Sequence, residues 1–298
     1  MAKENNYHGA GNVSVSAAVA EQARKEWEKA GIGNAFIFGK VMTSRQDLLL
    51  ELLQYSLPEM QIRSLCDVRR ETDIQLSMDA HGVRLDVSAH DDHGRTIDVE
   101  MQLRDEKNIP RRMRYYVGSV DQTILEKGKD YSELADTVIM FITPFDPFGK
   151  GLIRYTFRSI CEEDRELELD DGTSKVILNA CGTKGKVSVD LKDFLKLVVG
   201  GKADKKGSYA DRVQKEVVKT RRNAECRRQF MEWKMTLLNE WTKGREEGIK
   251  EGIKEGEQAG GLKMLSRLLE KGLISLEDAS REAGMPSSEF LRKTAGKS

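Results

Sequence analysis

The sequence predicts an α/β protein with a mixed central sheet flanked by helices, and with a helical extension toward its C-terminal end. Residues 83–102 alternate in hydrophobicity like a β-hairpin. Residues 137–143 (TVIMFIT) form a continuous apolar run between Asp136 and Pro144, which is typical of a strand buried on both faces. Helix-like segments lie before, between and after these strands, and this order favours an α/β core.

The predicted hairpin carries the first candidate site. Hydrophobic residues occupy every second position of its two halves: Val83, Leu85 and Val87, then Ile97, Val99 and Met101. The sequence Asp91-Asp92-His93-Gly94 predicts the turn between them. Pairing of the two strands would bring Asp86 beside Glu100 and Gln102, which share one strand face. Two interpretations remain open: a solvated face of an antiparallel pair, or an acidic cluster suited to a hard divalent cation.

The segments before the hairpin predict two helices. The first covers residues 17–30, and the second covers residues 45–56, with Thr43 and Ser44 as its cap and Pro58 after its end. A compact apolar stretch lies between them, and residues 62–78 carry weak strand signals. Glu51 lies within the leucine stripe of the second helix, either on its exposed face or as a carboxylate supplied to the acidic cluster.

A third helix is predicted after the hairpin, over residues 111–127, with Gly128 as its stop. Its first turns carry a group of basic and aromatic residues: Arg111, Arg112, Arg114, Tyr115 and Tyr116. Basic residues at a helix start oppose the helix dipole, so binding to phosphate explains them better than helix stabilisation does. The alternative is that the arginines are solvated and the tyrosines pack at the rim of the core.

The chain then returns to strands and ends in helices. Strands are expected at 153–160 and 175–180, and a short helix at 193–199. Residues 202–234 hold eleven Lys or Arg against five Asp or Glu and look helical. This segment is either a solvated helix face or a nucleic-acid patch.

A repeat of period four, REEG-IKEG-IKEG-EQAG, covers residues 245–260 and predicts an extended, marginal helix or spacer. No predicted strand leads into it, so it is not a phosphate-binding loop. The tail predicts small helices that resemble half of a helix-turn-helix or form an interaction module. The expected organisation is a core domain at 30–200, a basic helix and repeat spacer at 201–260, and a helical module at 261–298 through which the chain could form homo-oligomers.

Composition narrows the class of protein. Lys plus Arg and Asp plus Glu both number 49, so the global charge does not indicate a nucleic-acid binder. Cys66, Cys161, Cys181 and Cys226 lie far apart without a CxxC pair, which argues against a zinc site or a disulfide scaffold. No apolar run approaches the roughly 20 residues of a membrane span. We therefore expect a cytoplasmic protein that does not contact membranes.

Several motifs, taken in order, resemble those of one nuclease family. They are AFIFGKVM at 35–42, VRLDV at 83–87, IDVEMQ at 97–102, RMRYY at 112–116, EKGKDYSEL at 126–134 and FDPFGKG at 145–151. Together they resemble the PD-(D/E)XK nuclease superfamily, and most closely its recombination-promoting, transposase-like branch. The resemblance implies a restriction-endonuclease-like core and magnesium-dependent cleavage of DNA, with Mn²⁺ as a substitute for Mg²⁺.

The resemblance also assigns roles to individual residues. Asp86, Glu100 and the main-chain carbonyl of Met101 would hold the metal ion, and Glu51 is a weaker candidate for a further ligand. Gln102 occupies the position of the motif lysine, and it keeps hydrogen bonding but loses the positive charge. Arg112 or Arg114 would have to supply that charge.

Three functions follow from these features. The first is a metal-dependent DNA endonuclease linked to recombination or mobile elements. The second is a catalytically weak DNA-binding or regulatory protein that retains the nuclease fold, which the Gln102 substitution favours. The third is an interaction protein that works through its repeat and tail.

Overall fold

The computed structural model describes residues 20–74, 83–125 and 128–294. The chain divides into two compact units, one that ends at Met231 and one that begins at Glu232. The first unit holds the sheet and the helices that cover it. No helix within the described residues is both long enough and apolar enough to cross a membrane.

The core of the first unit is a mixed sheet of six strands in the order β1-β2-β3-β4-β6-β5. Their bounds are Leu65–Ile74 (β1), Val83–Asp91 (β2), Thr96–Met101 (β3), Thr137–Thr143 (β4), Arg154–Phe157 (β5) and Thr173–Asn179 (β6). Strands β3, β4 and β6 are parallel neighbours, whereas β1, β2 and β5 pair antiparallel. The predicted mixed sheet is confirmed.

The predicted hairpin and the predicted buried strand are both present. In the hairpin, β2 pairs with β3 in the register Val87–Val99 and Ala89–Ile97, and Gly94 in the turn has a φ of 78°. A positive φ at this position explains why glycine closes the turn. Strand β4 is buried at every residue because it lies between two parallel neighbours and under helices on both faces.

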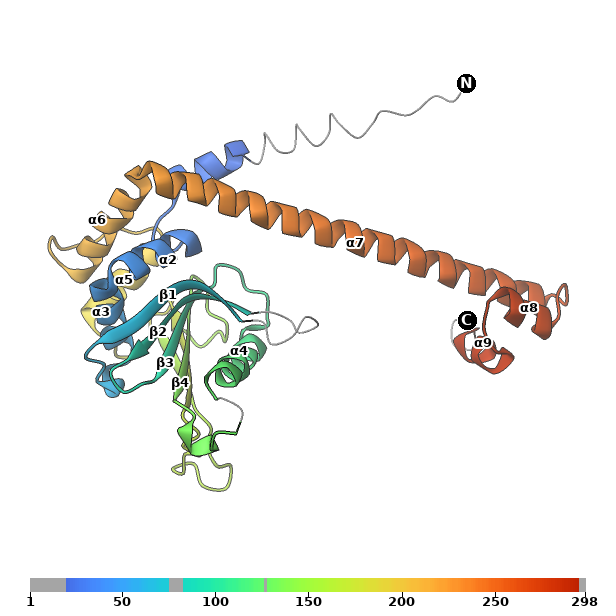
Figure 1. Ribbon diagram of the computed structural model, residues 1–298, viewed down its shortest axis with the longest axis horizontal. Coiled ribbons are helices and arrows are strands. Elements are labelled where there is room, and N and C mark those ends of the chain that lie inside the picture. Colours follow the sequence, from blue (N-terminus) through green and yellow to red (C-terminus); the bar gives the residue numbers. More distant parts are fainter. Residues whose placement is uncertain (1–19, 75–82, 126–127, 295–298) are drawn as a thin grey trace. The chain divides into compact units, whose positions relative to one another are not determined.

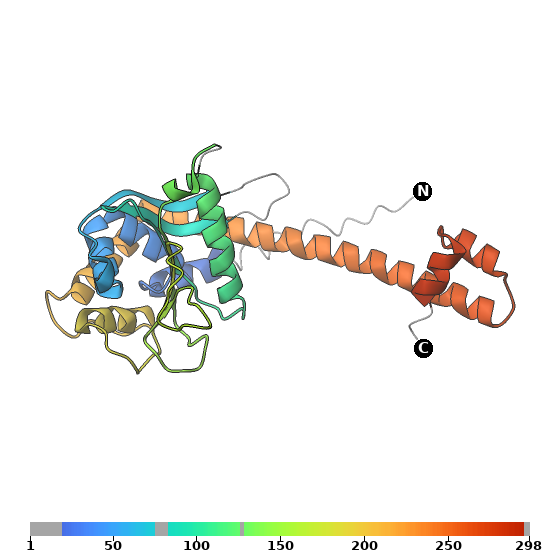
Figure 2. The same ribbon diagram turned by 90° about the horizontal axis from the view of Figure 1, so that it is seen from below.

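Helices cover the two faces of the sheet, as Figures 1 and 2 show. Helix α4 (Ile109–Ile124) lies on one face and packs its buried stripe on Ile139 and Phe141 of β4. The other face is covered by α2 (Ala35–Ser44), α3 (Gln46–Ser56) and α5 (Val189–Val198), with α6 (Tyr209–Arg222) packed on this helical layer. The hairpin therefore presents one strand face to α4 and the other to the layer of α2.

Some predicted boundaries are wrong. Thr43 and Ser44 do not cap α3, because they lie in the last turn of α2 and donate hydrogen bonds to the carbonyls of Gly39 (2.7 Å) and Val41 (3.1 Å). Helix α4 begins before the predicted start, with Pro110 in its first turn, where its missing N–H costs nothing.

Other elements differ from their predicted lengths. Helix α4 ends at Ile124, and residues 126–127 of the predicted helix lie outside the described residues. The same holds for residues 17–19 of the first predicted helix, of which residues 20–29 are helical, and for residues 75–78 of the weak strand signal. Strand β5 is shorter than 153–160, and α5 begins earlier than predicted, at Val189, because Ser188 caps it.

The second unit contains most of the long helix α7 (Ala224–Glu270), followed by α8 (Leu276–Glu282) and α9 (Ser287–Thr294). The period-four repeat is helical and exposed throughout. A methyl group added at any of its glycines, from Gly248 to Gly260, would meet no atom within 4 Å beyond the neighbouring backbone of the helix itself. Helices α8 and α9 bury Ala279 and Phe290 between them and form a small hydrophobic centre of their own.

Candidate metal-binding and catalytic site

Asp86 and Glu100 lie side by side on the face of the hairpin that α4 covers. They are one step beyond the paired residues Val87 and Val99 of β2 and β3. Glu100 Oε1 accepts a hydrogen bond from the backbone N–H of Asp86 (2.9 Å), and Asp86 Oδ2 accepts one from the backbone N–H of Met101 (2.9 Å). Each carboxylate is thus held by the backbone of the opposite strand. The sheet register fixes the pair before any ligand arrives.

The environment of Glu100 makes its negative charge costly. Glu100 as a residue is 4% exposed. Burial raises the pKa of Glu100 to about 8, and the charge of Asp86 acts in the same direction, while the Asp86 N–H and Arg112 oppose the rise. Burial and the nearby carboxylate thus disfavour the ionised form of Glu100. A cation placed beside this pair would favour the ionised form.

A third carboxyl group, Asp98, lies one pleat away from Glu100 on the same face of β3. It is fully buried, and neither of its oxygens has a hydrogen-bond partner among the described atoms. Burial, reinforced by Glu100 and Asp86, raises the pKa of Asp98 well above its usual value. Asp98 is not among the site residues predicted from the sequence. The sequence could have indicated Asp98, because the alternation that places Glu100 and Gln102 on one strand face places Asp98 on that face as well.

Arg112 enters the site from α4 and contacts Gln102, which the resemblance places at the position of the motif lysine. Its guanidinium donates hydrogen bonds to the Gln102 amide oxygen and to the Tyr116 hydroxyl (2.8 Å), and it forms an ion pair with Glu100 (3.5 Å). The same group lies over the rings of Phe141 (5.2 Å) and Tyr116 (5.4 Å). The positive charge missing from the side chain of Gln102 is thus present on its immediate neighbour.

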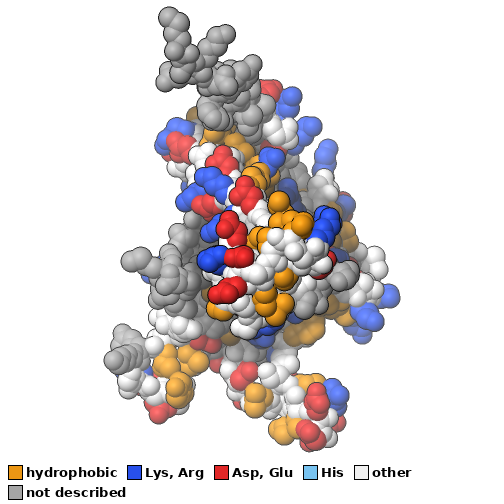
Figure 3. All heavy atoms as spheres, turned by 90° about the vertical axis from the view of Figure 1, so that its right-hand side faces the viewer, with side chains coloured by type: hydrophobic (Ala, Val, Ile, Leu, Met, Phe, Trp, Pro, Cys, Tyr) orange, Lys and Arg blue, Asp and Glu red, His pale blue; other side chains and the backbone are white. Residues whose placement is uncertain are grey.

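The predicted DNA-binding group on α4 divides into two sets. Arg111, Arg114 and Tyr115 are exposed, whereas Arg112 and Tyr116 point toward the sheet, where Tyr116 packs edge-on against Phe141. The burial of Tyr116 agrees with packing at the core, whereas phosphate binding by the arginines stays a prediction. On the face drawn in Figure 3, basic, acidic and hydrophobic side chains are interspersed, as the balanced composition leads one to expect. Attraction of a phosphate backbone would depend on local groups such as the α4 arginines.

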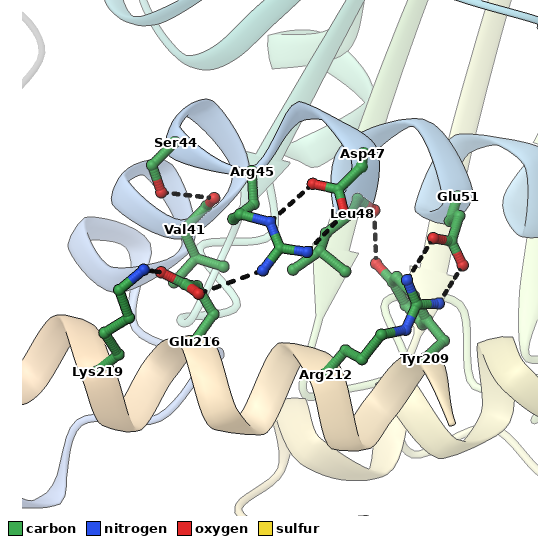
Figure 4. A network of polar contacts seen from close by, with 10 residues as sticks. All are labelled: Val41, Ser44, Arg45, Asp47, Leu48, Glu51, Tyr209, Arg212, Glu216 and Lys219. Atoms are coloured by element: carbon green, nitrogen blue, oxygen red, sulfur yellow. Dashed lines mark hydrogen bonds and ion pairs between the residues drawn. The ribbon is translucent and has the colours of Figure 1, made fainter. Parts of the chain in front are cut away.

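Glu51 is the predicted metal ligand that the structure does not bring to this pair. It lies on α3, in the helical layer on the other face of the sheet, where both of its oxygens accept hydrogen bonds from the guanidinium of Arg212 on α6 (2.7 Å for one of them). Figure 4 shows this contact together with the bond from the Tyr209 hydroxyl to the Leu48 carbonyl (2.9 Å). Its geometry suits a clamp between α3 and α6.

This position leads to a prediction for Glu51→Gln. A two-pronged, partly exposed carboxylate–guanidinium pair contributes about 1 kcal/mol, so we expect the variant to lose roughly that much stability in urea unfolding. Arg212→Gln should give a similar loss, and the double variant should lose less than the sum. Any activity that depends on the Asp86–Glu100 pair should be retained in all three proteins. Loss of that activity in Glu51→Gln at unchanged stability would instead place Glu51 at the site.

Within the described residues, Asp91, Asp92 and His93 form a group close enough to hold a metal ion. This group is the hairpin turn, at the far end of the strands from Glu100. Asp91 accepts hydrogen bonds from the N–H groups of His93 (2.9 Å) and Arg95 (3.0 Å) and binds the Arg95 side chain, while Asp92 accepts from the N–H of Arg63 (2.9 Å). These contacts already explain the two acids as stabilisers of the turn.

Comparison with known proteins bears on the same region. Residues 35–179, from the start of α2 to the end of β6, match the model of a family described as PD-(D/E)XK nuclease family transposase. No curated protein and no solved structure matches the chain. The matched segment contains Asp86, Asp98, Glu100, Gln102 and Arg112.

Proposed function

Because residues 35–179 form a domain of the PD-(D/E)XK nuclease family, we propose that this protein is a metal-dependent DNA endonuclease that acts in recombination or on mobile elements. The observation that carries the proposal is the pair Asp86–Glu100. Its two carboxyls are fixed by the opposite strand and accompanied by a guanidinium. Such a combination of acids and one fixed cation suits phosphodiester hydrolysis.

The residues present fit a divalent cation. PD-(D/E)XK nucleases generally use divalent metals. Asp86, Glu100 and the carbonyl of Met101 offer the oxygen ligands that Mg²⁺ and Mn²⁺ prefer. The raised pKa of Glu100 and the unpartnered oxygens of Asp98 indicate a deficit of positive charge in this region. A bound ion would lower the pKa of a water molecule and offset charge on the phosphate.

The protein groups around the pair have separate tasks in this proposal. Arg112 is fixed by Gln102 and Tyr116, so its charge is available to a scissile phosphate without reorganisation. The exposed Arg111 and Arg114 lie on the same helix and would contact neighbouring phosphates of the DNA backbone. Helix α4 therefore supplies both the charge at the reacting phosphate and the contacts that position the strand.

The test is a plasmid cleavage assay at several divalent metals. We expect the purified full chain to nick or linearise supercoiled DNA with Mg²⁺ or Mn²⁺ and to lose this activity when EDTA is added. The reaction should slow as salt rises, because phosphate contacts are screened. Retention of DNA without cleavage in any of these metals would contradict the proposal and would favour a DNA-binding protein that keeps the nuclease fold.

A further inference from the structure

The carboxyl group of Asp98 is unusual among the buried polar groups of the first unit. Its residue is completely inaccessible to solvent, and both of its oxygens lack a hydrogen-bond donor among the described atoms. Buried polar atoms are nearly always hydrogen-bonded, and burying one without a partner is costly. Both oxygens of Asp98 carry this free-energy cost, and a bound ligand would remove it.

The position of Asp98 indicates what kind of ligand this is. It is two residues before Glu100 on β3, so both side chains leave the strand toward α4. Asp86 is the cross-strand neighbour of Glu100, and Arg112 contacts Glu100 from above (3.5 Å). Counted in their charged forms, three carboxylates face one guanidinium. The remaining two negative charges match one divalent cation.

The three carboxyl groups differ in the internal hydrogen bonds and ion pairs that they would lose on binding a cation. Glu100 is bound to the Asp86 N–H and to Arg112, and Asp86 is bound to the Met101 N–H. Both must turn from a protein partner at least in part to face an ion. The Asp98 oxygens have no described hydrogen bond to lose. Its contribution to binding would therefore not be reduced by the loss of an internal contact.

We propose that Asp98 is a third carboxylate ligand of the divalent cation held by Asp86 and Glu100. This inference rests on the proposed function, since it concerns the same ion. It extends the site from the two acids of the motif to an acid that lies deeper under α4. It also explains why the chain keeps an unpaired carboxyl group in the core of the sheet.

Binding of Mn²⁺ to the full chain tests the inference without any measurement of cleavage. Thermal unfolding is followed over a Mn²⁺ titration for wild type and for Asp98→Asn, which keeps the size of the side chain and removes its charge. Ligand charge tunes the affinity of such sites, so the Mn²⁺ concentration that gives a fixed rise in Tm should increase about tenfold or more. Asp98→Val, which replaces the carboxyl group by apolar atoms, should show the same loss of Mn²⁺ response.

Asp121→Asn is the matched control, because Asp121 is a partly buried carboxyl on the sheet side of α4 that already accepts a hydrogen bond from the Thr137 hydroxyl (3.2 Å). It should respond to Mn²⁺ like wild type. A wild-type dependence of Tm on Mn²⁺ concentration in both Asp98 variants would overturn the inference. If wild type shows no Mn²⁺ response at all, the proposed metal dependence fails. If Asp86→Asn loses the response while the Asp98 variants keep it, only the role of Asp98 fails.

Discussion

Asp86→Asn and Glu100→Gln are each expected to lower the rate of DNA cleavage by about 10³-fold or more, because a hydrolytic metal site contributes several kcal/mol to transition-state stabilisation. Both substitutions leave an oxygen that can accept the existing backbone hydrogen bond, from Met101 for residue 86 and from Asp86 for residue 100. The hairpin should therefore keep its register. The expected loss of cleavage rate would therefore report the removal of a negative charge and not a change of the hairpin.

Initial rates of plasmid nicking at saturating Mn²⁺ measure this effect, with far-ultraviolet circular dichroism and Tm as checks of folding. The control is Asp92→Asn, which changes an exposed acid of the same hairpin that binds the Arg63 N–H at the turn. It should cleave at the wild-type rate. Equal rates in all four proteins would exclude the pair as the reaction centre. Loss of cleavage in Asp92→Asn alone would move the metal site to the turn.

The hairpin could be predicted because its signals are local. Alternation of period two and the Asp-Asp-His-Gly turn determine both the register and the shared face of Asp86 and Glu100, and the register decides which side chains meet. Strand β4 could be predicted equally well, because a continuous apolar run of strand length is typical of a strand buried inside a sheet. These two elements were enough to define the core of the site.

Glu51 could not be placed from the sequence because its partner is distant. The leucine stripe of α3 shows which side of the helix is buried, and Glu51 lies at the margin of that stripe. Which element covers this margin depends on α6, more than 150 residues later in the chain, where Arg212 takes both carboxylate oxygens. The assignment of Glu51 to the metal rested on resemblance, and the fold gives its carboxylate another use.

For the three arginines of α4, in contrast to Glu51, the sequence alone indicates which one faces the sheet. The buried residues of the helix, Ile109, Met113, Tyr116 and Val120, recur at intervals of three and four. Arg112 precedes Tyr116 by four residues and so borders this stripe, while Arg111 and Arg114 fall on the opposite side. The helical periodicity therefore places Arg112 toward the site and the other two arginines toward solvent.

The position of Arg112 leads to the second large effect. Arg112→Met should lower the cleavage rate by about 10²-fold, a typical result of removing one preorganised charge or donor from a transition state. Methionine keeps an apolar chain over Phe141 and Tyr116, so the loss reports the charge more than the packing. Arg114→Met removes an exposed arginine from the same helix. It should mainly weaken DNA binding and reduce its salt dependence.

Moving the positive charge from residue 112 to residue 102 tests whether Arg112 acts through its charge. If the guanidinium replaces the lysine of the family motif, then Gln102→Lys introduced into the Arg112→Met protein should recover a large part of the lost rate, because the ammonium group would come from the adjacent residue that follows β3. The same substitution in the wild-type protein places two cations beside Glu100 and should give no gain. Recovery in the double variant, measured by single-turnover cleavage, would show that a positive charge is needed at this point and that either element can supply it. Failure to recover at full Mn²⁺ binding would mean that Arg112 acts through its contacts with Gln102 and Tyr116, as a positioning residue.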